Sequence, residues 1–291
     1  MSSGNKRRAL KAGTWYTDNA RELEGDLKRW SSVSTPSPAA KAIISPHAGY
    51  SYSGETAGYA FGTIDPSKIA TVFVLGPSHH KYMENDCAVT TMSVYETPLG
   101  DIPIDTEITK ELLKTKCFSK MSRSTDENEH SIELQLSYIY HSMGGKPFKL
   151  VPILVGSLNS QACTEYAQTL LQYFNSPDTF FVFSSDFCHW GRRFNYYHLN
   201  EDITPIWKSI EWLDREGMKY IEEQSPQKFA AYLKKHQNTI CGRNPIQILL
   251  NLLVLTSDKY RVELKHYAQS NHCITELDSS VSYVAAVVSS V

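Results

Sequence analysis

Short apolar runs recur along the chain, and segments with helical spacing separate most of them. The runs Ile69–Leu75 and Thr179–Ser185 are apolar enough for strands that are buried on both faces. Alternation of strand-like and helix-like segments is typical of α/β layer architectures. We therefore predict an α/β fold with a central, mostly parallel or mixed sheet flanked by helices.

The predicted elements cover most of the chain. Strands are expected at 39–45, 69–75, 87–95, 148–155, 179–185, 261–269 and 280–288. Helices are expected at 54–62, 105–114, 125–143, 160–174 and 202–214, and two more begin at Ser225–Pro226 and Asn244–Pro245. The Pro- and Ser-rich stretches are short and no internal repeat is visible, so we expect one domain over residues 1–291.

The composition is that of an ordinary globular protein. The 29 Lys and Arg nearly balance 31 Asp and Glu, a formal charge of -2, which gives no case for a nucleic-acid partner. No run approaches the roughly 18 apolar residues of a membrane span, and Met1–Lys11 is polar and basic. Six cysteines are scattered singly without a CxxC motif, which favours free thiols in a reducing compartment. We expect a protein without a membrane span that is located in the cytoplasm, with the nucleus as a further candidate location.

Histidines directly follow the first two predicted strands. His47 lies in SPHAGYSYSG and His79 in LGPSHH, and their spacing is about the length of one βαβ unit. The strand at 179–185 runs into Asp186 and His189. Because the carboxyl ends of parallel strands meet at one edge of the sheet, these four side chains are expected to form one site there.

Two other segments carry candidate ligands. Cys241 lies in NTICGRNP, a polar turn in which Arg243 favours ionisation of the thiol, so it is the best metal ligand of the six cysteines. A structural, buried cysteine is the alternative. His130 and Glu133 are three residues apart and share a face of the helix predicted at 125–143. That spacing is found in metal sites, but a solvated acidic first turn explains the segment as well.

Eight blocks of the sequence resemble the Memo family, named as mediators of receptor-driven cell motility. They are AGTWY (12–16), PHAGYSYSG (46–54), LGPSHH (75–80), DENEHSIE (126–133), VPILVGSL (151–158), SSDFCHWG (184–191), NTICGRNPI (238–246) and DSSVSYVA (278–285). Several of these blocks are long and compositionally unusual, and together they extend over almost the whole chain.

The Memo family is in turn similar in fold to class III extradiol dioxygenases, which bind non-haem Fe(II) through two histidines and a carboxylate. By this resemblance His47 and His79 match the histidine ligands, His189 matches the acid/base histidine, and Cys241 stands in place of the carboxylate. A thiolate makes the site softer, which favours copper or a differently tuned iron. The resemblance implies one copper or iron ion, a redox-capable pocket, a regulatory role, and a cleft for a phosphotyrosine-containing peptide.

Three functions follow from these expectations: a metal-binding regulatory protein, with Asp186 and His189 beside the ligands; a non-haem iron dioxygenase that acts on a small aromatic diol, with His189 as base; and a metal-free peptide-binding module. The expected cleft has an aromatic wall and basic groups for a phosphate or carboxylate. The candidate wall residues are Trp15, Tyr16, Tyr50, Tyr52, His80 and Trp190, and the basic ones are Arg192, Arg193 and Arg243.

Overall fold

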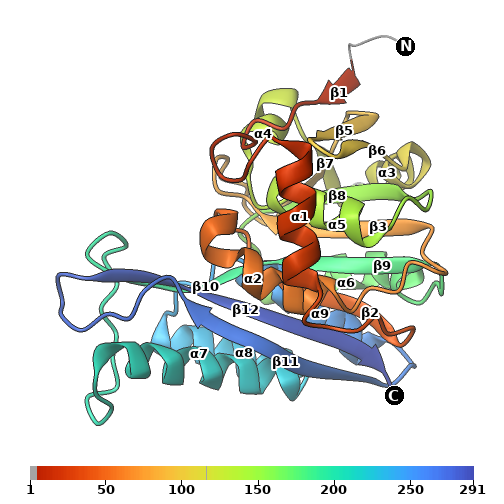
Figure 1. Cartoon of the computed structure of the whole chain (residues 1–291). Coiled ribbons are helices and arrows are strands. Elements are labelled where there is room, and N and C mark those ends of the chain that lie inside the picture. Colours follow the sequence, from red (N-terminus) through yellow and green to blue (C-terminus); the bar gives the residue numbers. More distant parts are fainter. Residues whose placement is uncertain (1–4, 116) are drawn as a thin grey trace.

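Four parallel strands form the centre of the larger sheet in the computed structural model, which describes residues 5–115 and 117–291 (Figure 1). In spatial order they are β2 (Ala40–Ser45), β9 (Thr179–Ser184), β3 (Thr71–Pro77) and β8 (Lys149–Val155). Successive side chains point to opposite faces, so Phe181 and Phe183 lie in one buried cluster and Phe180 and Val182 in the other. Burial of both faces explains why these strands are apolar almost throughout. The expected domain of residues 1–291 also includes residues 1–4 and 116, which lie outside the described residues.

Antiparallel strands extend this sheet on both sides and make it mixed. β12 (Ser279–Ser290) pairs with β2, and both β10 (Asp186–Gly191) and β11 (Tyr260–Gln269) pair with β12. On the other side, β4 (Cys87–Val89) pairs with β8 and with β7 (Phe118–Lys120). A smaller sheet joins β1 (Lys6–Arg7), β5 (Val94–Thr97) and β6 (Gly100–Pro103). The predicted α/β class with a mixed sheet is confirmed.

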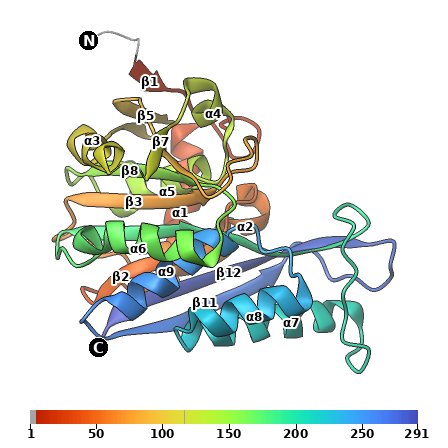
Figure 2. The ribbon, with the colours of Figure 1, turned by 180° about the vertical axis from the view of Figure 1, so that it is seen from behind.

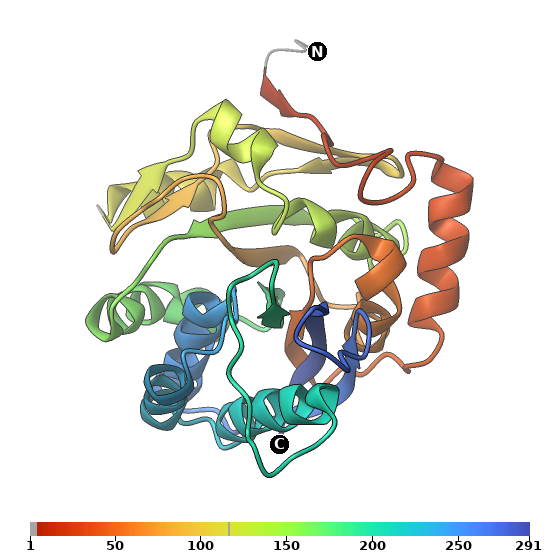
Figure 3. The ribbon, with the colours of Figure 1, turned by 90° about the vertical axis from the view of Figure 1, so that its left-hand side faces the viewer.

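Helices cover both faces of the larger sheet (Figures 1 and 2). One face carries α1 (Ala20–Ser31), α2 (Tyr50–Phe61) and α5 (Glu133–Ser142). The other carries α6 (Ser160–Phe174), α7 (Ile206–Glu222), α8 (Pro226–His236) and α9 (Arg243–Leu255). The short helices α3 (Thr106–Lys114) and α4 (Arg123–Asn128) contact β7 and β1, respectively. Figure 3 shows the sheet between the two sets of helices. Within the described ranges, none of the helices is both long and apolar enough to cross a membrane.

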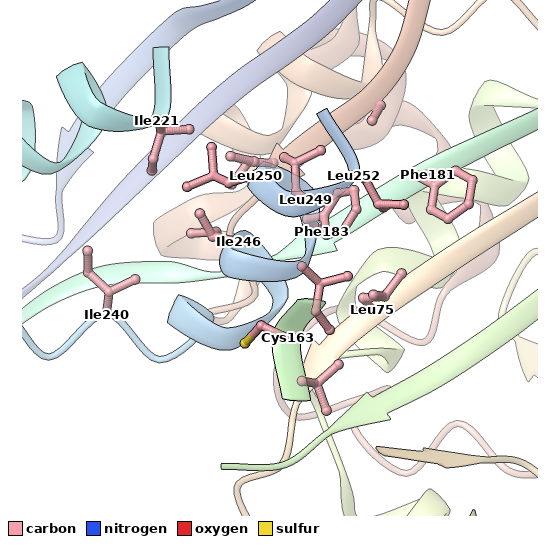
Figure 4. Close-up of a cluster of buried hydrophobic side chains, with 14 of the residues drawn as sticks. Leu75, Cys163, Phe181, Phe183, Ile221, Ile240, Ile246, Leu249, Leu250 and Leu252 are labelled. Carbon is pink, nitrogen blue, oxygen red and sulfur yellow. The ribbon is translucent and has the colours of Figure 1, made fainter. Parts of the chain in front are cut away.

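The face covered by α6 and α9 holds the larger apolar core (Figure 4). Ile246 and Leu249 of α9 belong to the same buried cluster as Phe181 and Phe183 of β9. Cys163 of α6 lies in this cluster as a free thiol, and the other five cysteines are also free. Cys163 therefore serves as a small core hydrophobe.

Three predicted elements differ from the structure in their division or in where they begin. The strand expected at 87–95 is two strands in different sheets, β4 and β5, because the chain turns at Thr90, whose hydroxyl accepts from the backbone N–H of Met92. The helix expected at 202–214 begins only at Ile206, since a proline disfavours helical backbone in the residue before it, and Pro205 stands there. Asn244 does not cap α9, which begins at Arg243. Its side chain donates to the carbonyl of Gly156 instead.

The helix predicted at 125–143 is interrupted. α4 ends at Asn128, Glu129 is extended with a ψ of 132°, and α5 begins at Glu133. The backbone N–H groups of His130 and Ser131 are bonded by the side chain of Glu129 rather than by a preceding helical turn. The interruption places His130 outside both helices, so the prediction that it shares a helix face with Glu133 is wrong.

Candidate metal centre

The carboxyl ends of three central strands bring His47, Asp186 and His79 together. His47 lies two residues after β2, His79 two residues after β3, and Asp186 two residues after Ser184 at the end of β9. β9 lies between β2 and β3, so the two histidine-bearing strands are not direct neighbours. All three strands are parallel, and their side chains therefore still meet at one edge.

His47 is buried, and its hydrogen bonds fix its tautomer. Its Nδ1 lies 2.7 Å from Oγ of Ser184, which donates its own hydrogen to the carbonyl of Ser131 and accepts from Nε2 of Gln135. A hydroxyl has one hydrogen to give, so the Nδ1–H of His47 must be the donor and Nε2 is left as the free ligand atom. Burial lowers the pKa of His47 well below its usual value, with the nearby His79 ring as a further cause, which keeps this ring neutral.

Glu129 fixes His79 in the same way, but with a charged partner. Its Oε1 lies 2.9 Å from Nδ1 of His79, and its Oε2 accepts from the His79 backbone N–H at 2.7 Å. A carboxylate only accepts hydrogen bonds, so Nδ1 donates and Nε2 is the ring nitrogen left for a ligand. Burial alone would raise the pKa of Glu129, but its hydrogen bonds to His79 and the charge interaction with that ring outweigh burial and lower the pKa.

His130 completes a three-histidine cluster, whereas the sequence had paired it with Glu133 instead. Its ring lies 4.3 Å from that of His79 and 5.4 Å from that of His47, measured between ring centroids. One ring nitrogen from each of the three lies within 4.8 Å of the other two, and no other such group of three His, Cys, Asp or Glu occurs in the described residues. Nδ1 of His130 is buried and makes no hydrogen bond in the structure. A buried imidazole nitrogen without a hydrogen bond, close to two other histidines, is a feature that a metal ion would satisfy.

Cys241 reaches the same place from the turn before α9. Its Sγ lies 3.1 Å from Nε2 of His47 and accepts from the backbone N–H of Asp186 at 3.3 Å. Sulfur therefore contacts the predicted ligand atom of His47. The expectation that this thiol ionises readily is wrong for the metal-free chain, because burial, followed by the charge of Asp186, raises the pKa of Cys241.

Asp186 and His189 also line the cavity beside the histidine cluster. Oδ1 of Asp186 accepts from the backbone N–H of His47 at 2.8 Å, and burial raises the pKa of this carboxyl, with His189 opposing the shift. Nδ1 of His189 lies 2.8 Å from the carbonyl of Phe187, so it carries the hydrogen and Nε2 is the proton-accepting nitrogen. The arrangement is chemically suited to an acid/base role for His189.

A cavity of about 540 Å³ opens onto these residues. His47, His79, His130, Asp186 and His189 line its floor, and Trp15, Tyr52, Arg193, Phe194 and Tyr283 are among the residues of its walls. The aromatic side chains Trp15 and Tyr52 are 38% and 64% exposed, which leaves their rings available to a ligand.

Other candidates from the sequence lie elsewhere. Tyr16 is buried, and its hydroxyl donates to Glu133. Trp190 is fully buried in the core on the α6–α9 face, because it follows His189 on β10 and its side chain takes the opposite direction. His80 is exposed outside the cavity lining, and Arg243 lines a separate hollow with α8. Their binding roles stay predictions that this placement does not favour.

The donor set fits a transition metal. Imidazole nitrogen suits copper, iron and zinc, and a thiolate adds preference for softer ions. The three histidines meet the spacing of a ligand set, whereas Cys241 contacts His47 and does not form such a group with His47 and His79 in the structure. The roles predicted for His47, His79, Cys241, Asp186 and His189 stay predictions.

Known proteins resemble this chain over nearly its whole length. The family described as Memo-like protein matches residues 7–287. A Caenorhabditis elegans protein named memo-1 homolog is 46% identical over 289 residues, covering 97% of this chain and 82% of its own. The human protein MEMO1 is 44% identical over 288 residues, covering 97% of each chain. A solved structure of an uncharacterized Escherichia coli K12 protein covers 84% of this chain and 99% of its own, with a TM-score of 0.51 at 14% identity, which indicates a shared fold.

Proposed function

The chain belongs to the Memo family, and from this premise we propose that it is a metal-binding, redox-capable regulatory protein. The observation that carries the proposal is the cluster of ring nitrogens of His47, His79 and His130 within 4.8 Å of one another. The site takes one ion of copper or iron. We propose that residues 1–291 form the single Memo-like domain that contains it.

His47 and His79 are the two ligands common to both possible ligand sets. Cys241 is the proposed third ligand, since its Sγ already contacts Nε2 of His47, and His130 is the competing third ligand. Copper or iron bound here would supply one-electron redox chemistry. The chain's own contribution is to hold the imidazole rings in the tautomers that present Nε2, and to hold Asp186 and His189 at the cavity floor.

The cavity above the cluster is the proposed cleft for a phosphotyrosine-containing peptide of a signalling protein. Support comes from the exposed rings of Trp15 and Tyr52, which suit an aromatic side chain, and from the guanidinium of Arg193, which suits a phosphate. A regulatory role in cell motility is part of the same proposal and rests on family membership.

Metal counting by mass spectrometry tests the proposal on protein purified anaerobically without chelator. The wild type should hold near-equimolar metal, and His47→Ala should lose it. His80→Ala, a matched exchange outside the cavity lining, should keep the wild-type content. Equal metal in wild type and His47→Ala would contradict the proposal and favour the metal-free peptide-binding module.

A non-haem iron dioxygenase is the second candidate function, favoured by the free Nε2 of His189 at the cavity floor. We expect extradiol cleavage of simple catechols to be absent or very weak, because Cys241 replaces the hard oxygen ligand suited to Fe(II) and O₂. Oxygen uptake by iron-loaded protein with a panel of catechols tests this. A turnover of roughly 1 per second or more would establish the enzyme.

A further inference from the structure

A fully buried arginine lies behind the interruption between α4 and α5. Arg7 comes from β1, more than 120 positions before the interruption, and its side chain is 0% exposed. It forms ion pairs with Asp126 in α4 at 3.0 Å and with Glu133 in α5 at 2.8 Å. One planar guanidinium therefore binds both helices that the interruption separates.

The same guanidinium donates hydrogen bonds to two backbone carbonyls that would accept from backbone N–H groups in a continuous helix. Its Nε donates to the carbonyl of Asp126 at 3.1 Å, and its Nη2 donates to the carbonyl of Glu129 at 3.0 Å. In an unbroken helix these carbonyls would accept from the N–H groups of His130 and Glu133. The carboxylate of Glu129 accepts from the N–H groups of His130 and Ser131 instead. Arg7 and Glu129 together satisfy these four backbone groups of the broken turn.

Glu129 joins this interruption to the histidine cluster. Its two carboxylate oxygens accept from the Nδ1–H and the backbone N–H of His79, while its own backbone carries His130 as the next residue. Arg7 is itself held in place, because Tyr95 of β5 lies under its guanidinium at 5.2 Å and donates to Asp126. Two of the three clustered rings therefore depend on contacts that begin at β1.

We propose that Arg7 and Glu129 are paired positioning residues for the metal centre, through which β1 sets the orientation of His79 and His130. This inference rests on the proposed function for its consequence in metal binding. It makes a separate claim about the rings in the metal-free chain, since the contacts that orient them involve no metal.

The test uses Arg7→Lys and Glu129→Gln, with Arg8→Lys as the matched control. Lysine keeps the charge of Arg7 but lacks the fork that reaches both helices, and glutamine at 129 places an amide N–H against donors. Arg8 is the next residue, its side chain is 63% exposed, and it binds only the α4 side of the interruption, through Glu127.

Two readouts separate this inference from the proposed function. The ¹⁵N NMR shifts of the metal-free protein should show His79 as one tautomer, protonated at Nδ1, in the wild type and in Arg8→Lys, and as a mixture in Arg7→Lys and Glu129→Gln. Cu(I) affinity, measured anaerobically against a chromophoric chelator, should fall about 10- to 100-fold in the same two variants.

The ring shifts decide the positioning role. An unchanged His79 spectrum in folded Arg7→Lys would overturn it, whatever the affinity does. If Arg7→Lys does not fold, the same spectrum of Glu129→Gln decides. This variant removes the contact between Glu129 and His79, at the other end of the series of contacts that begins at Arg7. A wild type that shows the single tautomer but binds no Cu(I) would count against the proposed function and leave the positioning role standing.

Discussion

The two sides of the histidine cluster are held by different kinds of contact. On the charged side, His79 and His130 depend on Glu129, which Arg7 ties to two further buried carboxylates. On the neutral side, His47 depends on Ser184, whose other partners are an amide nitrogen of Gln135 and a backbone carbonyl. Both sides fix a ring by bonding its Nδ1.

The difference matters because the cost of losing a partner depends on what remains. An ion left alone in the interior carries its whole desolvation penalty, whereas an unpaired hydroxyl or amide carries a much smaller one. The charged side should therefore control stability and ligand geometry together, and the neutral side should control mainly the geometry of His47.

The largest expected effect is that of Arg7→Met. It leaves Asp126 and Glu133 buried without their cation, so the free energy of unfolding should fall by about 3–5 kcal/mol. Arg8→Met removes an exposed pair with Glu127 and should cost much less. Chemical denaturation of the metal-free proteins measures both. Equal losses in the two variants would remove the distinction between a buried and an exposed arginine here.

Ser184→Ala tests the neutral side. It leaves the Nδ1–H of His47 without an acceptor in a buried place, which should lower the free energy of unfolding by about 1–3 kcal/mol. Metal affinity should also fall about 10- to 100-fold, because the tautomer of His47 is no longer fixed.

Ser45→Ala is the control, since Ser45 is equally buried and lies beside Ser184 in the strand register. Its hydroxyl makes only a long 3.5 Å bond to the next carbonyl. A loss in Ser45→Ala as large as in Ser184→Ala would mean that burial, and not the bond to His47, sets the cost.

The residues at the strand ends were predictable from the sequence on both sides of the cluster, and the contacts that hold the charged side were not. Residues that follow apolar strands meet at one edge whatever the strand order, so His47, His79 and Asp186 needed only local patterns. The interruption at Glu129 has no clear local signal, because residues 122–131 are all polar and the apolar helical spacing begins only at Ile132. The two carbonyls freed there accept from Arg7, a contact between distant parts of the chain that the sequence does not show.

Neighbouring residues on one strand show a second limit. His189 and Trp190 were both expected at the cleft, but strand alternation sends them to opposite faces, and only His189 lines the cavity. No strand was predicted for residues 186–191, and this segment is β10, paired with β12. The acidity of Cys241 was misjudged because a turn that is polar in sequence is buried in the fold, and it also lies against Asp186; both raise the pKa of the thiol.

Cys241→Ser tests whether the neutral side contributes a ligand. Serine is nearly isosteric but stays a neutral hydroxyl, so copper affinity should fall at least about tenfold, equivalent to about 1.4 kcal/mol. Cys163→Ser in the α6 core and Cys117→Ser before β7 should keep the wild-type affinity, and circular dichroism should show all three folded. Cys241→Asp should shift preference from copper towards Fe(II). Wild-type copper affinity in Cys241→Ser would make His130 the third ligand.

The smallest expected effect is a pH dependence of the free energy of unfolding, which allows the two sides to be compared. Burial lowers the pKa of both His47 and His130 in the folded chain, with neighbouring histidine charges as the further cause, while the unfolded value stays near 6.5. Below pH 6.5 the unfolded state then binds more protons than the folded state, so stability is complete above that pH and falls as the pH drops. From pH 6.5 to 5.5 each ring should cost about 1 kcal/mol in the metal-free protein. Urea titrations of wild type, His47→Gln and His130→Gln at the two pH values should show each variant losing that share of the pH dependence. If only His47→Gln loses it, the carboxylate of Glu129 keeps His130 charged, and the two sides differ in protonation as well as in contacts.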